Sequence, residues 1–343
     1  MRDFFPILNE CIYLNTAYVG PPSTGLMQFR STYDHHFLEE VDQFKIKGND
    51  KLAAQRSSIA SFFGTQPNHT FIIPNFSVGI RFFLEYLPKK TRFLVLEADY
   101  PSLENAVRAG NFPTTVLPII AGLEENIEQA IDHGTIDVLA LSVVQYTSGV
   151  LIDQSFLSKL KKRYPNLLII ADGTQFLGTS LFHFDNAPFD LIVGSGYKWL
   201  LAGFGNGLAF VKPSYLDYCE TQLNTLENRI YAGHFDFLAA ASLTFAIKQL
   251  QDWDFPELLR IKNEVTDYLK SGLLERELLQ SFVVNRNQHS SIFNISATSD
   301  LHLKLLDKGV RCSFRGTGVR LSIHFYNTKK DIDNFFTVYD QLI

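Results

Sequence analysis

Apolar and polar residues alternate along the chain in two different periods. Short apolar runs at 93–96, 138–144 and 167–170 are closed by glycine or by polar residues, which is typical of buried strands in a parallel sheet. Helix signals lie between such runs, for example over 153–163. Strand, helix and strand at this spacing are typical of βαβ units. The sequence therefore predicts an α/β fold with a mostly parallel central sheet and helices on both of its faces.

The first third of the chain predicts helices and then a turn suited to an anion. We expect helices across 24–63, with Ser23 as an N-cap after a Gly-Pro-Pro run. A short strand over 70–74, a small polar turn and a helix start follow. Free backbone N–H groups and the positive end of the helix dipole would face a phosphate there. A simple N-cap role for Ser77 predicts the same local structure without a phosphate.

The last third of the chain predicts a smaller unit in which helices and strands are mixed. Apolar spacing indicates helices over 237–253 and 257–274. Strands are expected over 281–284, 292–295 and 319–323, and the last of these alternates like a half-exposed strand.

These patterns divide the chain into two expected domains. Residues 13–253 would form a large domain, and residues 1–12 together with 254–343 would form a smaller α+β C-terminal domain. A chain of 343 residues is long enough for both, and its 46% hydrophobic and 20% charged content is ordinary for a soluble globular enzyme.

Charge and hydrophobicity exclude several classes of partner. A net charge of −5 leaves no basic footprint for nucleic acid. No run approaches the roughly 20 apolar residues of a membrane span, and the N-terminus lacks the apolar core of a signal peptide. The cysteines Cys11, Cys219 and Cys312 are scattered, which favours reduced thiols and a cytoplasmic location. No metal-ligand spacing is present, so we expect no metal site.

Four polar side chains are expected to converge where two buried strands end. Asp172 closes one strand and Gln175 follows it, whereas Ser195 and Lys198 follow the next strand. The carboxyl ends of parallel strands carry the chemistry of such sheets. A lysine can form a Schiff base with an aldehyde cofactor, and an Asp can keep a pyridinium nitrogen protonated. The alternative is a solvated surface lysine and an N-cap aspartate.

This stretch resembles a known family. The segments Ala171–Gln175, Ser195–Leu200 and Gly203–Gly207 are similar to the signature of class V aminotransferases, which use pyridoxal phosphate (PLP) on the fold-type-I scaffold. That family includes cysteine desulfurases, kynureninases and isopenicillin-N-epimerase-like proteins. The resemblance implies that Lys198 forms the Schiff base and that Asp172 pairs with the ring nitrogen, as the two catalytic residues.

The resemblance also implies a set of contacts to the cofactor phosphate. The turn at 75–79 resembles the family's phosphate loop, in which Ser77 and the backbone of Val78 would bind. Ser195 and the hydroxyl of Tyr197, which flank the lysine, resemble further phosphate contacts.

Three other residues are implied to lie against the cofactor ring. Tyr100 matches the aromatic residue that stacks on the ring in the family, and Gln175 matches the amide that reaches the phenolate oxygen. Tyr146 stands where desulfurases usually carry an Asn near the ring, in a segment that resembles kynureninases.

The ends of the matching region imply a substrate clamp and a partner subunit. Asn15 and Arg320 match residues that seat the substrate carboxylate, and a planar guanidinium suits a carboxylate. Arg311 and Arg315 lie just ahead of Arg320 and could assist, or could form plain surface salt bridges. His234 stands at a position that in the family reaches across a dimer interface to the partner's phosphate, so the resemblance implies a homodimer with a shared active site.

The sequence predicts the cofactor, but it leaves more than one reaction open. The working label is an aminotransferase acting on a small amino acid, and the alternative is a PLP-dependent lyase or epimerase of the kynureninase, selenocysteine/cysteine lyase or isopenicillin-N-epimerase type. A cysteine desulfurase is disfavoured because Tyr197 replaces the family's His and Gly316 stands at the position of the mobile Cys. A non-catalytic PLP-fold binding protein is the alternative from another class.

Overall fold

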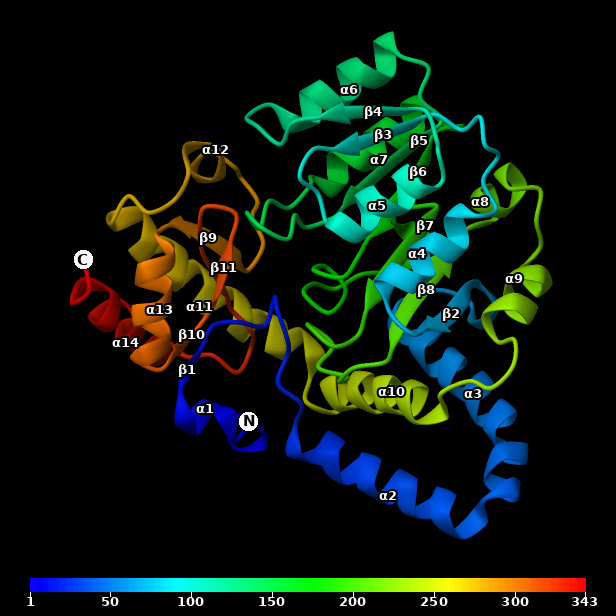
Figure 1. Ribbon diagram of the computed structural model, residues 1–343, viewed down its shortest axis with the longest axis horizontal. Helices are drawn as coiled ribbons and strands as arrows, with labels where there is room; N and C mark the ends of the chain where they lie inside the picture. Colours follow the sequence, from blue (N-terminus) through cyan, green and yellow to red (C-terminus); the bar gives the residue numbers. More distant parts are fainter.

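The computed structural model describes residues 1–343, apart from the side chain of Asn49. Its centre is a seven-stranded sheet with helices packed on both faces (Figure 1). The strand order is β2 (Thr70–Ile73), β8 (Gly207–Val211), β7 (Leu191–Ser195), β6 (Leu168–Asp172), β5 (Val138–Ser142), β3 (Phe93–Leu96) and β4 (Thr114–Leu117). Neighbouring strands are parallel except that β8 runs against both β2 and β7. The predicted α/β fold with a mostly parallel sheet is therefore confirmed.

Both faces of this sheet are buried, which explains the continuous apolar runs. Leu168 and Ile170 of β6 pack with helices α4 (Phe76–Leu84) and α5 (Pro101–Ala109). Ile169 and Ala171 of the same strand face the opposite core, which includes residues of α6 (Leu123–His133), α7 (Gln154–Arg163) and α10 (Phe237–Asp252).

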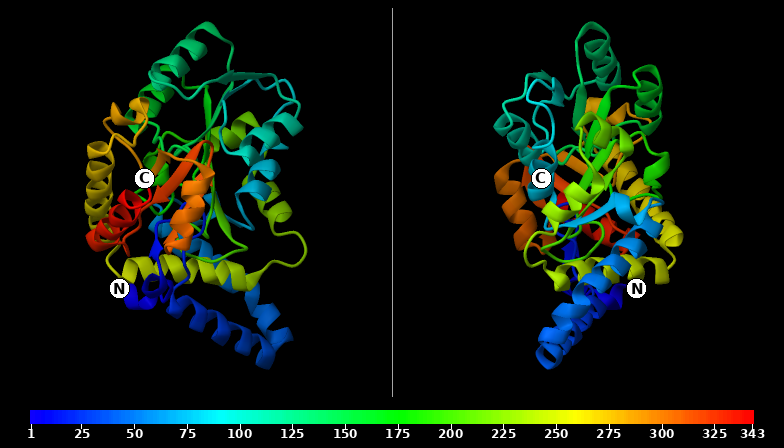
Figure 2. Two further views of the ribbon diagram at one scale, coloured as in Figure 1. Left: turned by 60° about the vertical axis from the view of Figure 1, so that its left-hand side comes forward. Right: turned by 90° about the vertical axis from the view of Figure 1, so that its right-hand side faces the viewer.

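The remaining helices follow the expected order along the chain. They are α1 (Ile7–Glu10), α2 (Thr24–Glu40), α3 (Asp42–Phe62), α6 (Leu123–His133), α7 (Gln154–Arg163), α8 (Pro213–Tyr218), α9 (Leu223–Ile230), α10 (Phe237–Asp252), α11 (Phe255–Glu275), α12 (Ser281–Val284), α13 (Ser299–Asp307) and α14 (Lys329–Asp340). Ser23 caps α2, because its hydroxyl accepts the N–H of Leu26 at 3.0 Å. Helices α2 and α3 form a hairpin that projects from the body of the molecule (Figure 2).

A second, antiparallel sheet lies toward the C-terminus, with the order β11 (Ser313–Arg315), β12 (Gly318–Ser322) and β9 (Ile292–Ser296). The strand predicted over 281–284 is wrong, because this segment is the short helix α12 and only Val283 of it is buried. A short apolar run cannot be assigned from periodicity alone. The two-domain division at 13–253 stays a prediction.

Strand β12 is buried along its whole length, so the prediction of a half-exposed strand is also wrong. Its polar residues face protein instead of solvent. Arg320 donates to the carbonyl oxygen of Tyr146 at 2.6 Å, and the hydroxyl of Ser322 accepts the N–H of Ala17 at 2.9 Å. The polar residues of the alternating pattern therefore mark the face of β12 that packs against the rest of the molecule.

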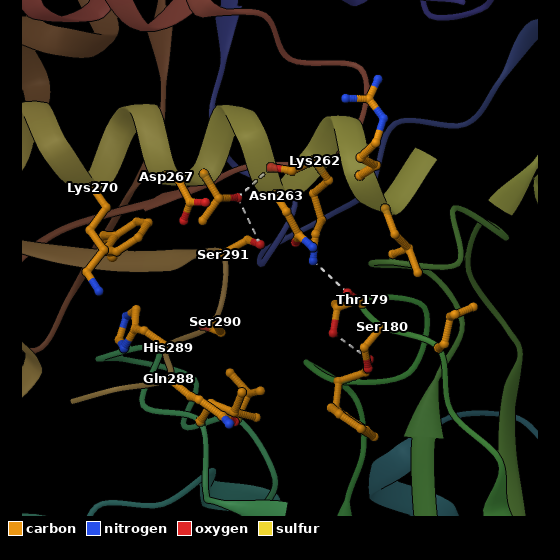
Figure 3. Close-up of a pocket in the computed structure, with 18 of the residues that line it drawn as sticks. Thr179, Ser180, Lys262, Asn263, Asp267, Lys270, Gln288, His289, Ser290 and Ser291 are labelled. Atoms are coloured by element: carbon orange, nitrogen blue, oxygen red, sulfur yellow. Dashed lines mark hydrogen bonds between the residues drawn. The ribbon is translucent and has the colours of Figure 1, made fainter. Parts of the chain in front are cut away.

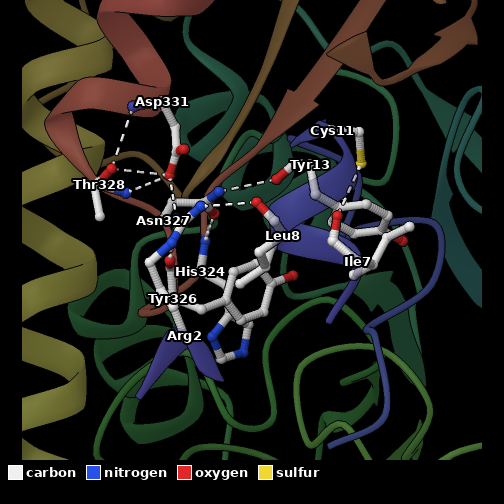
Figure 4. A network of polar contacts seen from close by, with 10 residues as sticks. All are labelled: Arg2, Ile7, Leu8, Cys11, Tyr13, His324, Tyr326, Asn327, Thr328 and Asp331. Carbon is white, nitrogen blue, oxygen red and sulfur yellow. Dashed lines mark hydrogen bonds and ion pairs between the residues drawn. The ribbon is translucent and has the colours of Figure 1, made fainter. Parts of the chain in front are cut away.

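The N-terminus is tied to the last quarter of the chain. Strand β1 (Ile12–Tyr13) pairs in parallel with β10 (Val310–Arg311). The guanidinium of Arg2 donates to the carbonyl oxygen of Tyr326 at 2.9 Å and to the carboxylate of Asp331 at 2.6 Å (Figure 4). The amide of Asn327 donates to the carbonyl oxygen of Tyr13 at 2.9 Å (Figure 4).

A search of the described helices for one long and apolar enough to cross a membrane finds none.

Candidate active site

Asp172 and Lys198 lie at the carboxyl ends of neighbouring parallel strands. Asp172 ends β6, and Lys198 follows β7 by three residues. Both are buried, with 4% and 6% of their surface exposed. Thr174 joins the two turns, because its N–H donates to Asp172 Oδ1 at 2.8 Å and its hydroxyl accepts the N–H of Ser195 at 3.3 Å. The turns that carry Asp172 and Lys198 therefore lie together at one edge of the sheet.

The Lys198 amine lies among rings and cations. Its Nζ atom is 5.7 Å from the ring centroid of Tyr100 and 5.6 Å from that of Tyr197. Among the described residues, no carboxylate lies within 4.0 Å of it. Burial and then the positive charge of Arg320 lower the pKa of Lys198 to about 7. The amine can therefore lose its proton near neutral pH.

The environment of Asp172 favours its protonated form. Burial, with a smaller contribution from the charge of Asp99, raises the pKa of this carboxyl to about 7, although the Thr174 hydrogen bonds and the charge of Lys198 oppose the change. Asp99 itself is 2% exposed and accepts the backbone N–H groups of Tyr100 at 2.6 Å and Ser142 at 2.8 Å. A cation beside Asp172, such as a ring N–H⁺, would restore its charged form.

Asp99 was not singled out as a site residue from the sequence. A signal was available, because it follows the buried strand β3 much as Asp172 ends β6.

The start of α4 lies beside Ser195, as the phosphate-loop prediction requires. The N–H of Phe76 donates to the Ser195 hydroxyl at 2.9 Å, and the hydroxyl of Ser77 donates to that of Ser102 at 2.7 Å. The N–H of Val78 is already taken, because Asn75 caps the helix with its side chain at 3.0 Å. The N–H of Ser77 has no partner among the described residues, so it is better placed than that of Val78 to bind an anion.

Both the nitrogen and the oxygen of the Gln175 side-chain amide form hydrogen bonds. Its Nε2 donates to the carbonyl oxygen of Ala17 at 2.9 Å, and its Oε1 accepts the indole N–H of Trp199 at 2.7 Å. One N–H of the amide is left for a ligand. The residue therefore also fixes the segment 15–20 against the turn that carries Lys198.

The same N-terminal segment closes over the lysine turn. The N–H of Gly20 donates to the carbonyl oxygen of Tyr197 at 3.0 Å. A Cβ atom on Gly20 would lie 2.0 Å from the carbonyl oxygen of Lys198. Only glycine permits this approach of two backbones. The lysine turn is also contacted by buried His324, whose Nε2 lies 3.1 Å from the carbonyl oxygen of Trp199.

Arg320 is a buried cation that has no acidic partner among the described residues. It is 2% exposed, its Nη1 donates to the carbonyl oxygen of Tyr146, and its Nε has no partner among the described residues. Burial lowers the pKa of Arg320 to about 10, so the group stays protonated at neutral pH. A buried charge in this state is costly unless an anion binds it.

Asn15 lies beside the same sheet. It forms an isolated parallel bridge with Ser322, and its side-chain oxygen accepts the hydroxyl of Ser313. The structure therefore places both predicted substrate contacts, Asn15 and Arg320, on the side of the site formed by β11 and β12.

Aromatic rings line the site. The ring of Tyr100 lies 5.5 Å from that of Tyr146 in an edge-on arrangement, and 5.8 Å from that of Phe76. Burial raises the pKa of Tyr197 to about 12, so its hydroxyl stays a hydrogen-bond donor. Tyr197 also contacts Phe204, whose centroid is 5.2 Å away.

Within one chain, His234 does not lie near the other predicted site residues. It lies exposed in the loop between α9 and α10. There it lines a cavity of about 590 Å³ with Tyr33, Phe37 and Phe44 from α2 and α3, and not with Lys198. Its predicted role therefore requires a second chain.

A further cavity of about 720 Å³ lies between α11 and the loops at 179–181 and 287–291 (Figure 3). Lys262 reaches down from α11 to the carbonyl oxygen of Thr179, and Lys270 and His289 lie toward its other end (Figure 3). None of the sequence-predicted site residues lines this cavity. Nor do the described His, Cys, Asp and Glu side chains form a group of three or more that could hold a metal ion.

Comparisons with known proteins agree with this geometry. A family model described as Aminotransferase class-V matches residues 26–335. The chain is 21% identical over 399 residues to a probable cysteine desulfurase of Borreliella burgdorferi, covering 98% of this chain and 94% of that protein.

Solved structures share the fold. A mutant of the protein C-DES with glycine covalently linked to its PLP cofactor matches with a TM-score of 0.87 at 15% identity, over 99% of both chains. The apo cysteine desulfurase of Thermococcus onnurineus matches with a TM-score of 0.84 at 16% identity, over 100% of this chain and 97% of that one.

Proposed function

The chain belongs to the class V aminotransferase family and is thus a PLP-dependent enzyme of fold type I, and from this premise we propose that it acts on a small amino acid through Lys198. The working label is an aminotransferase. The observation that carries the proposal is the buried Lys198 amine, which lies 5.7 Å from the ring centroid of Tyr100, interacts with the charge of Asp172 and has no ion-pair partner among the described residues.

The described residues fit the cofactor. When bound, PLP supplies a reactive aldehyde and an electron-withdrawing ring. Lys198 would hold it covalently, and the Asp172 carboxylate would hold the proton on its ring nitrogen, the cation that this buried acid lacks. Tyr100 would lie against the ring face and exclude water, and Gln175 would offer its remaining N–H to the phenolate oxygen.

The phosphate would lie at the start of α4. The N–H of Ser77, the Ser195 hydroxyl and the Tyr197 hydroxyl are the proposed donors. The Ser77 hydroxyl donates to Ser102 and would have to turn away from it to join them. Val78 was predicted as a donor, but its N–H already binds Asn75 at 3.0 Å, so the proposal moves that contact to Ser77.

The substrate carboxylate would bind Arg320, with Asn15 beside it. With a pKa of about 7, a sizeable share of the Lys198 amine is neutral at physiological pH. The neutral amine can act as a nucleophile and can take up or return a proton at the substrate α-carbon. These roles serve transamination, and they serve a lyase or an epimerase equally.

A lyase is the second candidate because relatives carry such names, including the cystine C–S lyase C-DES at a TM-score of 0.86. Cys312, the cysteine nearest to the family's nucleophile position, does not suit a desulfurase nucleophile. Cys312 is buried, burial raises the pKa of its thiol to about 12, and Gly316 stands at the family's Cys position. A thiol in this state is inert.

A homodimer is the proposed assembly. The hairpin α2–α3 leaves large apolar side chains exposed, among them Phe37 at 51%, Leu38 at 72% and Ile46 at 66%. An exposed apolar patch of this kind suits an interface, and it adjoins the loop that carries His234. A cytoplasmic location is proposed because Cys11, Cys219 and Cys312 are free thiols.

Absorbance spectroscopy tests the cofactor assignment. Protein mixed with PLP and freed of excess should absorb at roughly 410–430 nm. Lys198→Ala should lose this band, whereas Lys262→Ala, which removes another buried lysine, should keep it. A Lys198→Ala protein that retains the band would refute the assignment. A holoenzyme that converts none of the amino acids in a broad panel would favour the non-catalytic binding protein.

A panel of amino acids then separates the reactions. Release of a 2-oxo acid that depends on an amino acceptor would support the aminotransferase, and release of a side-chain fragment would support the lyase. Inversion of configuration at the α-carbon, without release of an oxo acid or a side-chain fragment, would support the epimerase.

A further inference from the structure

Two arginines of the small sheet point to the same side of the active site. In the antiparallel pair β11–β12, Ser313 lies opposite Arg320 and Arg315 lies opposite Gly318. Opposite residues share a face of a sheet, and so do residues two apart on one strand. Arg315 and Arg320 are therefore diagonal neighbours on one face.

That face meets the loop after β5. Arg320 donates to the carbonyl oxygen of Tyr146, and Asn294, which lies opposite Arg320 on β9, donates to that of Thr147 at 3.2 Å. A Cβ atom on Gly316 would lie 3.2 Å from the Thr147 side chain. The two arginines therefore lie on the face of the sheet that packs against the loop carrying Tyr146.

Neither arginine is neutralised by the protein. Arg315 donates to the carbonyl oxygen of the adjacent Phe314 and lies 5.2 Å from the ring centroid of Tyr18. Within the part of the chain that the structure describes, neither guanidinium has a carboxylate within 4.0 Å. Both cations are also close enough to the Lys198 amine to lower its pKa. A substrate with one carboxylate satisfies one of these two groups and leaves the other unpaired.

We propose that Arg315 and Arg320 together select an amino acid whose side chain carries a second anionic group, of the aspartate, glutamate or cysteine-sulfinate type. Arg320 binds the α-carboxylate, as in the proposed function on which this inference rests, and Arg315 binds the anion of the side chain. Planar guanidinium groups suit both oxyanions, and each pair forms charge-assisted hydrogen bonds.

Calorimetric titration of the PLP-loaded protein tests the inference without catalysis. Succinate and butyrate have four carbons each and no amine, so neither reacts with the cofactor. Succinate should bind about tenfold to a hundredfold more tightly than butyrate, which is the range expected for one extra charge-assisted hydrogen-bonded pair. Arg315→Gln should reduce this ratio to about one. Arg311→Gln removes an exposed arginine of β10, the strand that precedes β11 in the sequence, and should leave the ratio of the two affinities unchanged.

The outcomes separate this inference from the proposed function. Equal affinities of the wild-type protein for succinate and butyrate would overturn the selection of acidic substrates while the cofactor band remains. A ratio that Arg315→Gln leaves intact, or a loss of the cofactor band in that variant, would also overturn it. The absence of a cofactor band in the wild-type protein would refute the proposed function and this inference with it.

Discussion

Replacing Lys198 with methionine should stabilise the cofactor-free protein, and the gain should be largest below about pH 7. The amine is 6% exposed, and burial together with the Arg320 charge lowers its pKa from 10.5 to about 7. The folded state therefore binds fewer protons than the unfolded state between these two values, so the stability of the wild-type protein rises with pH there. Methionine has a similar length and no charge to bury.

The size of the effect follows from this change in pKa. Below pH 7 the full cost of the buried cation is present, about 5 kcal/mol at the upper limit. Near pH 9 the folded amine of Lys198 is neutral, and the same relation leaves about 2 kcal/mol. The advantage of the variant should therefore shrink by about 2–3 kcal/mol between pH 6 and pH 9.

Urea unfolding of both proteins near pH 6 and pH 9, after removal of PLP, measures this difference. Lys330→Met serves as the control, since Lys330 is exposed and its replacement should change stability by less than about 0.5 kcal/mol at either pH. If Lys198→Met were less stable than the wild type near pH 6, or if its advantage did not depend on pH, the reasoning from a buried, depressed amine would be wrong.

Three further changes test other parts of the site and its support. Gly20→Ala should cost about 2–3 kcal/mol in urea unfolding and weaken PLP binding, because the new Cβ meets the Lys198 carbonyl oxygen at 2.0 Å. Burial raises the pKa of the Asp172 carboxyl to about 7, so the unfolding free energy of the cofactor-free wild type should fall as pH rises from about 4 to 7. Asp172→Asn should make the unfolding free energy depend less on pH over this range. Lys161→Met should cost about 3–5 kcal/mol in the same assay, because it leaves the buried carboxylate of Asp190 without the amine 2.7 Å away.

The parts of the molecule that depend on local pattern were predictable from the sequence. Buried parallel strands need apolar residues on both faces, so the run at 168–171 identifies β6, and Asp172 at its end locates the site edge. The position of Lys198 follows from the same rule applied to β7.

The parts that depend on long-range pairing were not predictable. The register that places Arg315 and Arg320 on one face is set by β11 and β12 together, and no single strand reveals it. The predicted Val78 contact overlooked the Asn75 cap, because several side chains in that turn compete for the same N–H groups. The burial of β12 was missed because its polar residues bind distant backbone groups.

The docking of the first residues onto the last ones has a consequence for biosynthesis. Strand β1 has no partner until β10 has been made, and Ala17 has no acceptor until Ser322 has left the ribosome. Contacts between such distant parts of a chain form late in folding. The segment that closes over the lysine turn therefore waits, in every nascent copy, until Ser322 has been made and released.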